Sequence, residues 1–139
     1  MFNNNKRFKK FRKSSVNGIE YRKTTLYLGK FGIKSLENTR LTTKQLDTFL
    51  FTLKKQIKKT GKIWQCVQPV RSVTSKPNEV RMGKGKGAIK CWVAPVKKGQ
   101  ILYEVLPLKF KSEKKIILAL ESVIDKLPVS AKIITSDIF

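Results

Sequence analysis

The chain has 139 residues, with 31 Lys or Arg against 9 Asp or Glu and 40% apolar residues, so it carries a formal net charge of +22 and can still build one domain with a core. Because like charges repel one another in a compact state, the expected partner is a polyanion, either nucleic acid or an anionic membrane surface. Binding an acidic small molecule would not require so large a charge. The sequence contains no histidine, which excludes Ser-His-Asp and Cys-His catalysis and histidine metal clusters.

Residues 1–23 are predicted to form a basic N-terminal arm that carries no acidic residue before Glu20. Its cations are suited to phosphates, and Phe8 and Phe11 are suited to stack on bases or to wedge into a groove. Two alternatives stay open at this point: a transit peptide, although lysine outnumbers arginine and no long amphipathic face develops, and a solvated disordered tail. The candidate RNA contacts in the arm are Lys6, Arg7, Lys9, Lys10, Phe11, Arg12 and Lys13.

Residues 24–139 are predicted to form a single α+β domain, which begins with a short strand over residues 24–28 and a tight turn over residues 29–32. The best-marked element is a helix that begins at Thr42, since Gln45 completes a capping box and Leu41 and Leu46 are placed for a hydrophobic staple. Gly61 stands where the residue after the helix is expected. The apolar stripe of this helix is Leu46, Phe49, Leu50, Leu53 and Ile57.

The opposite side of the same helix carries lysines that form either a solvated face or a phosphate-facing one. They are Lys44, Lys54, Lys55, Lys58 and Lys59.

After Gly61 the hydrophobic period changes to that of strands. Residues 63–68 are predicted as a strand, and Pro69 and Pro77 bracket a looser segment. Residues 89–96 and 101–106 are predicted to pair as a hairpin, with Gly99 at positive φ in the connection. Cys66 and Cys91 lie in apolar runs without CxxC spacing, which favours two buried thiols over a zinc site or a disulfide.

The last elements are a helix that starts at the Ser112 cap and ends before Pro128, and a strand over residues 131–135. The apolar side of that helix is predicted to be Ile117, Leu120, Ile124 and Leu127. Two helices are therefore expected on one mixed or antiparallel sheet. No apolar run approaches 18 residues, so no membrane span and no membrane partner are expected.

Residues 81–87 alternate glycine with cations and are not explained by core building. Glycine makes the segment a poor helix and a poor strand, but it lets a slim backbone approach phosphates closely. A Walker loop and a dinucleotide fingerprint both fail on spacing, so the alternatives are a polyanion-binding loop or a merely flexible one. The candidate RNA contacts in this loop are Arg81, Met82, Gly83, Lys84, Gly85, Lys86 and Gly87.

This loop, followed by residues 92–94 and 96–104, resembles the signature of the large-subunit ribosomal protein L-sixteen family, bacterial and organellar type. The likeness extends in register through residues 10–13, 29–34, 40–42, 61–64, 76–77 and 126–128. It implies a hammerhead-type fold, no enzymatic activity, no cofactor and no metal. It also implies binding to large-subunit rRNA near the central protuberance, contact with A-site tRNA next to the peptidyl-transferase centre, neighbouring ribosomal proteins as partners, a role in late subunit assembly and no homo-oligomer.

Carried over by position, residues 81–87 resemble the loop that points toward the peptidyl-transferase region, residues 10–13 resemble the rRNA-threading arm, and residues 29–34 resemble an rRNA-contacting turn. The sequence departs from the family pattern over residues 14–20, at Cys66 and Gln68, and over residues 106–111, a segment that is longer than in the family. The further RNA-contact candidates are Lys30, Phe31, Lys34, Arg40, Lys55, Lys58, Lys59, Lys62 and Lys76.

Because the likeness begins essentially at Met1, the arm is expected to be mature protein, which weakens the transit-peptide alternative. Lysine far exceeds arginine, and Asn, Ile and Phe are frequent, as in AT-rich coding sequence. We therefore expect an organelle-encoded protein of the mitochondrial ribosome, with a plastid or the cytoplasm of an AT-rich bacterium as alternatives. A free RNA chaperone or DNA-compacting protein would also explain the charge, and an enzyme that uses lysine is the weakest alternative.

Overall fold

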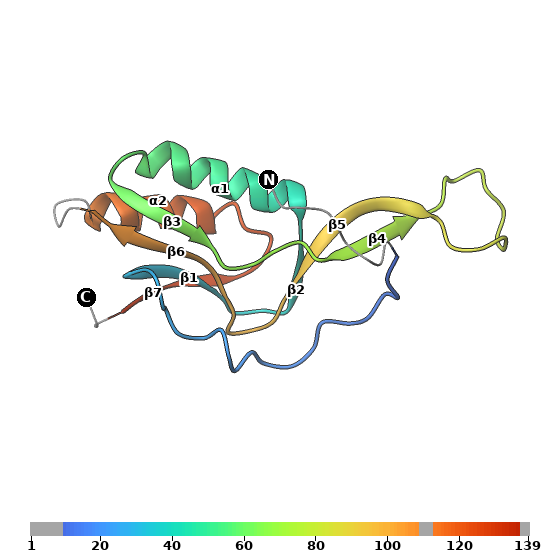
Figure 1. Cartoon of the computed structure of the whole chain (residues 1–139), viewed down its shortest axis with the longest axis horizontal. Coiled ribbons are helices and arrows are strands. Elements are labelled where there is room, and N and C mark those ends of the chain that lie inside the picture. Colours follow the sequence, from blue (N-terminus) through green and yellow to red (C-terminus); the bar gives the residue numbers. More distant parts are fainter. Residues whose placement is uncertain (1–9, 109–112, 137–139) are drawn as a thin grey trace.

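The structure is a computed structural model that describes residues 10–108 and 113–136. In that part of the chain, seven strands and two helices follow one another along the sequence (Figure 1). Their order is β1 (Phe31–Ser35), β2 (Thr39–Thr42), α1 (Thr43–Ile57), β3 (Gly61–Gln65), β4 (Arg71–Ser75), β5 (Ala88–Val96), β6 (Ile101–Pro107), α2 (Glu113–Ile124) and β7 (Ala131–Thr135).

The strands form two antiparallel sheets. One has the order β3-β6-β1-β7 and the other has the order β2-β5-β4. The two helices lie side by side over the four-stranded sheet, and the three-stranded sheet extends away from that body as a ribbon (Figure 1). The predicted α+β class with two helices on antiparallel strands is confirmed, while the expectation of one sheet is wrong.

The predicted hairpin is also wrong, because β5 and β6 belong to different sheets. Between them, the connection runs beside the connection from β1 to β2: the Ser35 amide donates to the Gln100 carbonyl at 2.9 Å, and the Gly99 amide donates to the Ser35 carbonyl at 2.8 Å. The β1–β2 and β5–β6 segments thus cross together from one sheet to the other, with β1 paired to β6 and β2 paired to β5. Gly99 has φ +87°, so its positive φ is confirmed.

Helix α1 begins as its capping box predicts. The Thr42 hydroxyl accepts from the Gln45 amide, and the Gln45 side chain accepts from the Thr42 amide at 2.8 Å. The helix ends earlier than expected, at Lys58 with φ 46°, so the prediction for Gly61 is wrong. Gly61 instead opens β3, where a Cβ would lie only 2.9 Å from the Leu106 carbonyl oxygen.

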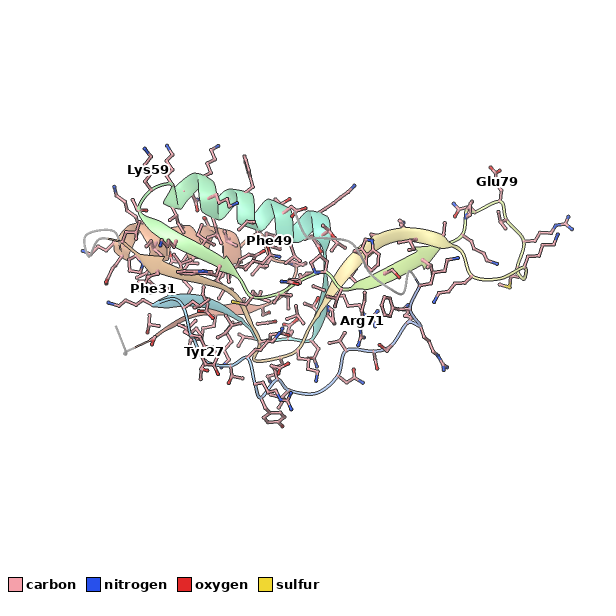
Figure 2. The ribbon with its side chains drawn as sticks, viewed as in Figure 1. Tyr27, Phe31, Phe49, Lys59, Arg71 and Glu79 are labelled. Atoms are coloured by element: carbon pink, nitrogen blue, oxygen red, sulfur yellow. The ribbon has the colours of Figure 1, made fainter. Side chains whose placement is uncertain are left out.

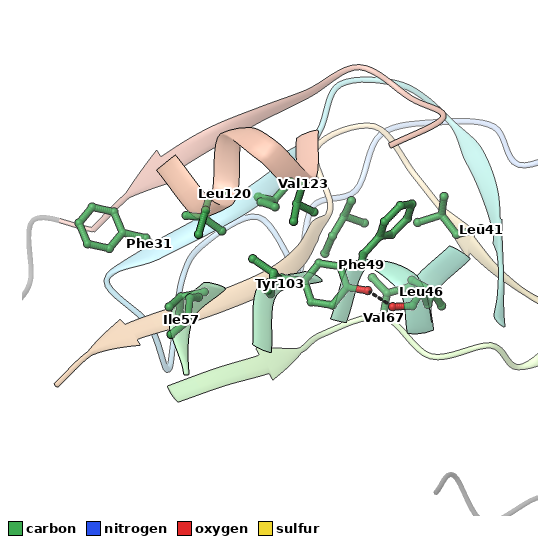
Figure 3. Close-up of a cluster of buried hydrophobic side chains, with 14 of the residues drawn as sticks. Phe31, Leu41, Leu46, Phe49, Ile57, Val67, Tyr103, Leu120 and Val123 are labelled. Atoms are coloured by element: carbon green, nitrogen blue, oxygen red, sulfur yellow. Dashed lines mark hydrogen bonds between the residues drawn. The ribbon is translucent and has the colours of Figure 1, made fainter. Parts of the chain in front are cut away.

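The core lies between the helices and the four-stranded sheet (Figure 3). Helix α1 buries Leu46, Phe49, Leu53 and Ile57, as its stripe predicts, with Leu50 packed at the margin. The Tyr103 hydroxyl donates to the Leu46 carbonyl at 3.0 Å, which joins β6 to the first turn of α1. This hydrogen bond satisfies a buried hydroxyl that would otherwise be costly to desolvate.

Helix α2 turns a slightly different side to the core than predicted. The fully buried positions are Ile116, Ala119, Leu120 and Val123, and the predicted Ile117, Ile124 and Leu127 are only partly buried. The helix ends at Ile124, and its predicted cap at Ser112 lies outside the described residues. The strand predicted over residues 131–135 is confirmed as β7.

Two other predictions about strands are wrong. Residues 24–28 form no strand, because the chain there bends around the Glu104 carboxylate and β1 begins only at Phe31. Strand β4 lies inside the segment expected to be loose, where it pairs with β5. The strand predicted over residues 63–68 overlaps β3 only over residues 63–65, because β3 begins at Gly61 and ends at Gln65.

Candidate nucleic-acid interface

The described part of the arm crosses the three-stranded sheet and is held there by arginines from two strands. Arg71 on β4 donates to the Ser14 hydroxyl at 2.6 Å, and Arg40 on β2 donates to the Ser14 carbonyl. Each guanidinium keeps further N–H donors that these bonds do not use. The arm candidates Lys6, Arg7 and Lys9 lie outside the described residues.

Two lysines fasten the arm to the start of β5. The Lys86 side chain donates to the Phe11 carbonyl, and the Lys10 side chain donates to the Lys86 carbonyl at 3.2 Å. Together with the Ser14 contacts, these bonds bring residues 10–14 and the Gly/Lys loop (residues 76–87), which are far apart in sequence, into one surface. The structure thus brings together the arm candidates Lys10, Phe11, Arg12 and Lys13 with Arg40 and Lys86.

A pocket of about 180 Å³ lies between the arm and the three-stranded sheet. Its walls carry cations and no carboxylate. They are formed by Phe11, Arg12, Lys13, Ser14, Arg40, Arg71, Ser72, Val73, Thr74, Lys86 and Val93. Across the described residues the one ion pair joins Lys30 to Glu113 at 2.8 Å, so the cations of the pocket have no acidic partner among those residues.

The Gly/Lys loop spans residues 76–87 and projects beyond the ends of β4 and β5 (Figure 1; Glu79 marks it in Figure 2). Its backbone takes positive φ at three successive residues, 92° at Gly83, 51° at Lys84 and 85° at Gly85. Arg81, Met82, Lys84 and Lys86 are exposed. Lys76 donates to the Gly83 carbonyl across the loop, so one predicted contact residue contributes to the loop's shape.

A second group of cations lies at the far end of the molecule. Lys59 marks this end in Figure 2, opposite the loop. The exposed lysines there lie in the last turn of α1, directly after it and at the start of β3, and they are Lys54, Lys55, Lys58, Lys59 and Lys62. Their exposure leaves both earlier interpretations available, a solvated face or a phosphate-facing one.

Residues 29–34 do not form a turn, which corrects the expectation for this segment. Residues 31–34 lie in β1, and Phe31 is 3% exposed in the core, so it is not a surface contact. Lys30 is paired with Glu113, and Lys34 donates to the Thr24 carbonyl at 3.4 Å. Both lysines are partly buried and serve the protein's own structure.

Two site residues escaped the sequence analysis. Arg71 lay in the segment predicted to be loose, although the β-branched Val73 and Thr74 beside it are typical of a strand. Glu104 lies in a strand whose residues 101–105 are all buried. An acidic residue inside an apolar run indicates a carboxylate with several partners, because an unpaired buried charge is strongly unfavourable.

The two cysteines are free and half-buried rather than fully buried, which corrects that prediction. The Cys66 thiol lies 3.5 Å from Glu104 Oε1. Burial and then the neighbouring Glu104 charge raise the pKa of Cys66 to about 12. Across residues 10–108 and 113–136 we find no cluster of three side chains suited to a metal ion and no helix long and apolar enough to span a membrane.

Comparison with known proteins gives a consistent result. Residues 3–134 match the family model described as "Ribosomal protein L16p/L10e". The chain is 40% identical over 131 residues to "Large ribosomal subunit protein uL16c" of Emiliania huxleyi, covering 94% of this chain and 93% of that one. It is 41% identical over 128 residues to "Large ribosomal subunit protein uL16" of Psychrobacter arcticus, covering 92% and 91%. A Mycobacterium uL16 is 40% identical over 120 residues, covering 86% and 85%.

Proposed function

This chain belongs to the ribosomal protein L16p/L10e family, so it is a structural ribosomal protein and not an enzyme, and we propose how it contacts RNA within the large subunit. Its partners are ribosomal RNA and neighbouring ribosomal proteins. The finer assignment is that it binds large-subunit rRNA near the central protuberance, takes part in late assembly and helps to shape the A site.

The observation that carries the rRNA contact is the cation-rich surface that joins the arm, the three-stranded sheet and the loop. Arg12, Lys13, Arg40, Arg71 and Lys86 line one pocket without a carboxylate among them. Cations that have no acidic partner in the part of the chain that the structure describes favour an external polyanion, since their mutual repulsion is relieved when phosphates approach. Hydrogen bonds that join the arm to Arg40 and Lys86 hold this surface in one arrangement before RNA arrives.

The loop supports the A-site assignment. It extends from the end of the ribbon, away from the helices and the core (Figure 1), so it can enter a crevice that the body of the protein cannot. Its exposed side chains include Arg81, Lys84 and Lys86, and its glycines leave backbone N–H groups accessible to phosphates. We infer that this loop contacts the accepted tRNA and the rRNA next to the peptidyl-transferase centre, as the family resemblance implies.

The proposed location is the mitochondrial ribosome, with the gene in the organelle. The excess of lysine over arginine and the frequency of Asn, Ile and Phe support an AT-rich genome. Localising a tagged chain by organelle fractionation, and locating the gene, distinguishes this proposal from a plastid or bacterial ribosome. A nuclear gene with an upstream presequence would contradict the proposal of organelle encoding.

Sedimentation in high salt tests the proposed function. The full chain is expected to co-migrate with the large subunit through a sucrose gradient at about 0.5 M monovalent salt, where purely electrostatic RNA binding weakens by orders of magnitude. A free RNA chaperone would instead move to the top of the gradient. If all of the protein dissociates from the large subunit already at low salt, the assignment as a subunit component would be contradicted.

A further inference from the structure

We propose that the pocket between the arm and the three-stranded sheet binds one unpaired RNA nucleotide, with its base against Phe11 and the valines and its phosphate on the arginines. This inference rests on the proposed function, since it specifies how the same surface holds RNA. The pocket would then recognise a base that is not stacked within an RNA helix. A uniformly cationic surface would not distinguish such a base.

The pocket walls combine apolar side chains with cationic ones. Phe11 and Val73 are partly accessible apolar side chains, and Val93 forms a buried apolar floor. A phosphate alone is bound by cations and N–H donors and gains nothing from apolar surface. A nucleotide uses both, because its base has an apolar face that stacks on aromatic side chains while its phosphate pairs with cations.

Two arginines are held beside the pocket by one serine of the arm. Arg40 and Arg71 come from the two edge strands of the three-stranded sheet, β2 and β4, and both donate to Ser14, one to its carbonyl and the other to its hydroxyl. Ser14 therefore aligns two guanidinium groups beside the same pocket. Each retains donors for a phosphate, and a planar guanidinium binds phosphate oxygens in pairs.

The size and walls of the pocket favour an unpaired nucleotide over a base-paired one. A base within a duplex has its faces covered by neighbouring base pairs, so it cannot enter a pocket of about 180 Å³ walled on two sides by protein. A bulged or looped-out nucleotide exposes both faces. The lining residues include cations and no carboxylate, which disfavours a cationic ligand such as a protein amine and favours an anion.

The test uses the full-length chain and three RNA hairpins of equal phosphate number. One hairpin is fully paired, one has a single bulged nucleotide, and one has an abasic residue at the same bulge. Wild-type protein is expected to bind the bulged RNA about tenfold more tightly than the abasic RNA, as one stacked base would give. Equal affinity for the bulged and abasic RNAs would overturn the proposal.

Substitutions of Phe11 test whether this side chain gives the preference for the bulged RNA over the abasic RNA. Phe11→Ala is expected to reduce the bulged-to-abasic ratio to near one, and Phe11→Tyr, which keeps the aromatic face, is expected to retain it. Phe51→Ala is the matched control, because Phe51 is 69% exposed on α1 and does not line the pocket. A ratio that persists in Phe11→Ala, with the fold intact by circular dichroism, would overturn the proposal.

Two further measurements separate related outcomes. Adenosine monophosphate is expected not to compete at concentrations where the bulged hairpin saturates, and polyglutamate of equal charge is expected not to replace RNA. Competition by either would assign the pocket to a free nucleotide or an acidic protein and overturn the RNA proposal. If wild-type protein binds no RNA and leaves the large subunit in low salt, the proposed function itself has failed, which is a different result from an equal ratio.

Discussion

The Glu104 carboxylate oxygen Oε2 lies 3.0 Å from the amide nitrogen of Gly29, and it also accepts from the amides of Tyr27 and Leu28 at 3.2 and 2.7 Å. Three successive N–H groups therefore converge on one oxygen of a side chain that is 4% exposed. This contact fixes the point where the chain leaves the arm and enters β1. It links the arm to the core and so limits where the proposed RNA contacts of the arm can lie.

We predict that Glu104→Ala lowers the free energy of unfolding by about 3 kcal/mol or more, because it leaves backbone donors without an acceptor in a partly or fully buried place. Glu104→Gln keeps an acceptor oxygen but loses the charge, so we expect a loss of about 1–2 kcal/mol. Glu121→Gln, on the exposed side of α2, is the control and should be neutral. Urea unfolding measures all three, and a Glu104→Ala variant as stable as wild type would contradict the structural role.

Cys66 is predicted to react slowly in the native state. Since the thiolate is the nucleophile and the native pKa is about 12, only about one thiol in ten thousand is ionised at pH 8. In a Cys91→Ser background, maleimide should modify the folded protein at least about 100-fold more slowly than the urea-unfolded protein. Glu104→Gln should speed the native reaction, because removing the nearby negative charge lowers the pKa of Cys66. Equal rates for folded and unfolded protein would contradict this prediction.

The raised pKa of Cys66 also makes the free energy of unfolding depend on pH in the alkaline range. The pKa of Cys66 is higher in the folded than in the unfolded state, so the unfolded thiol ionises first as the pH rises. The contribution of the neutral thiol to stability is therefore complete below about pH 9 and is lost between about pH 9 and 12. Cys66→Ala should show a shallower alkaline decline in unfolding free energy than wild type. An identical decline in both proteins would contradict the linkage.

Elements that depend on residues close together in the sequence can be predicted from it. Strand pairings and hydrogen bonds between residues far apart in the sequence depend on the whole fold and cannot. Thr42 and Gln45 satisfy one another within one turn, so the start of α1 was found to the residue. The pairing of β5 depends on β2 and β4, and nothing in residues 97–100 shows that the chain there passes to another sheet. The loop over residues 81–87 was recognised because glycine and lysine have no use in a core. The role of Ser14 was not, because its two arginines come from distant strands.

The capping box offers a test with a matched control inside the same helix. Thr42→Ala removes the hydroxyl that accepts from the Gln45 amide, and it should cost about 1 kcal/mol of unfolding free energy. Thr48 is exposed in the helix interior, where its hydroxyl only donates back to the Lys44 carbonyl. Thr48→Ala should be neutral or slightly stabilising, since alanine has the higher helix propensity. Equal losses in the two variants would show that the cap is not the source of the effect.

Gly87 and Gly85 should differ sharply although both belong to the loop. A Cβ at Gly87 would lie 2.7 Å from the Ser75 carbonyl carbon, against backbone that cannot move without parting β4 from β5. At Gly85 nothing lies within 4 Å, and only its φ of +85° opposes a side chain. Gly87→Ala should therefore destabilise the protein more than Gly85→Ala, whose cost should be about 1 kcal/mol. Thermal or urea unfolding compares them, and the opposite order would contradict the close approach at Gly87.

The proposed contact of the loop with tRNA is best tested with residues that do not line the pocket between the arm and the three-stranded sheet. Arg81→Ala combined with Lys84→Ala removes two exposed charges from the loop and leaves Lys86 in place. Large subunits that carry this double variant should assemble but bind aminoacyl-tRNA in the A site several-fold more weakly, with P-site binding unchanged. If both side chains neutralise phosphates, the slope of log affinity against log salt should also fall in magnitude by roughly 1.5 to 2.

Lys114→Ala combined with Lys115→Ala is the control for that experiment, because it removes the same charge from exposed positions in the first turn of α2. These lysines belong to the helical body of the molecule rather than to the ribbon that carries the loop (Figure 1). The control subunits should bind A-site tRNA as wild type does, since a general loss of net charge acts equally in both variants. A-site affinity that is unchanged in the Arg81 and Lys84 variant, or reduced equally in both, would show that the loop does not contact the accepted tRNA.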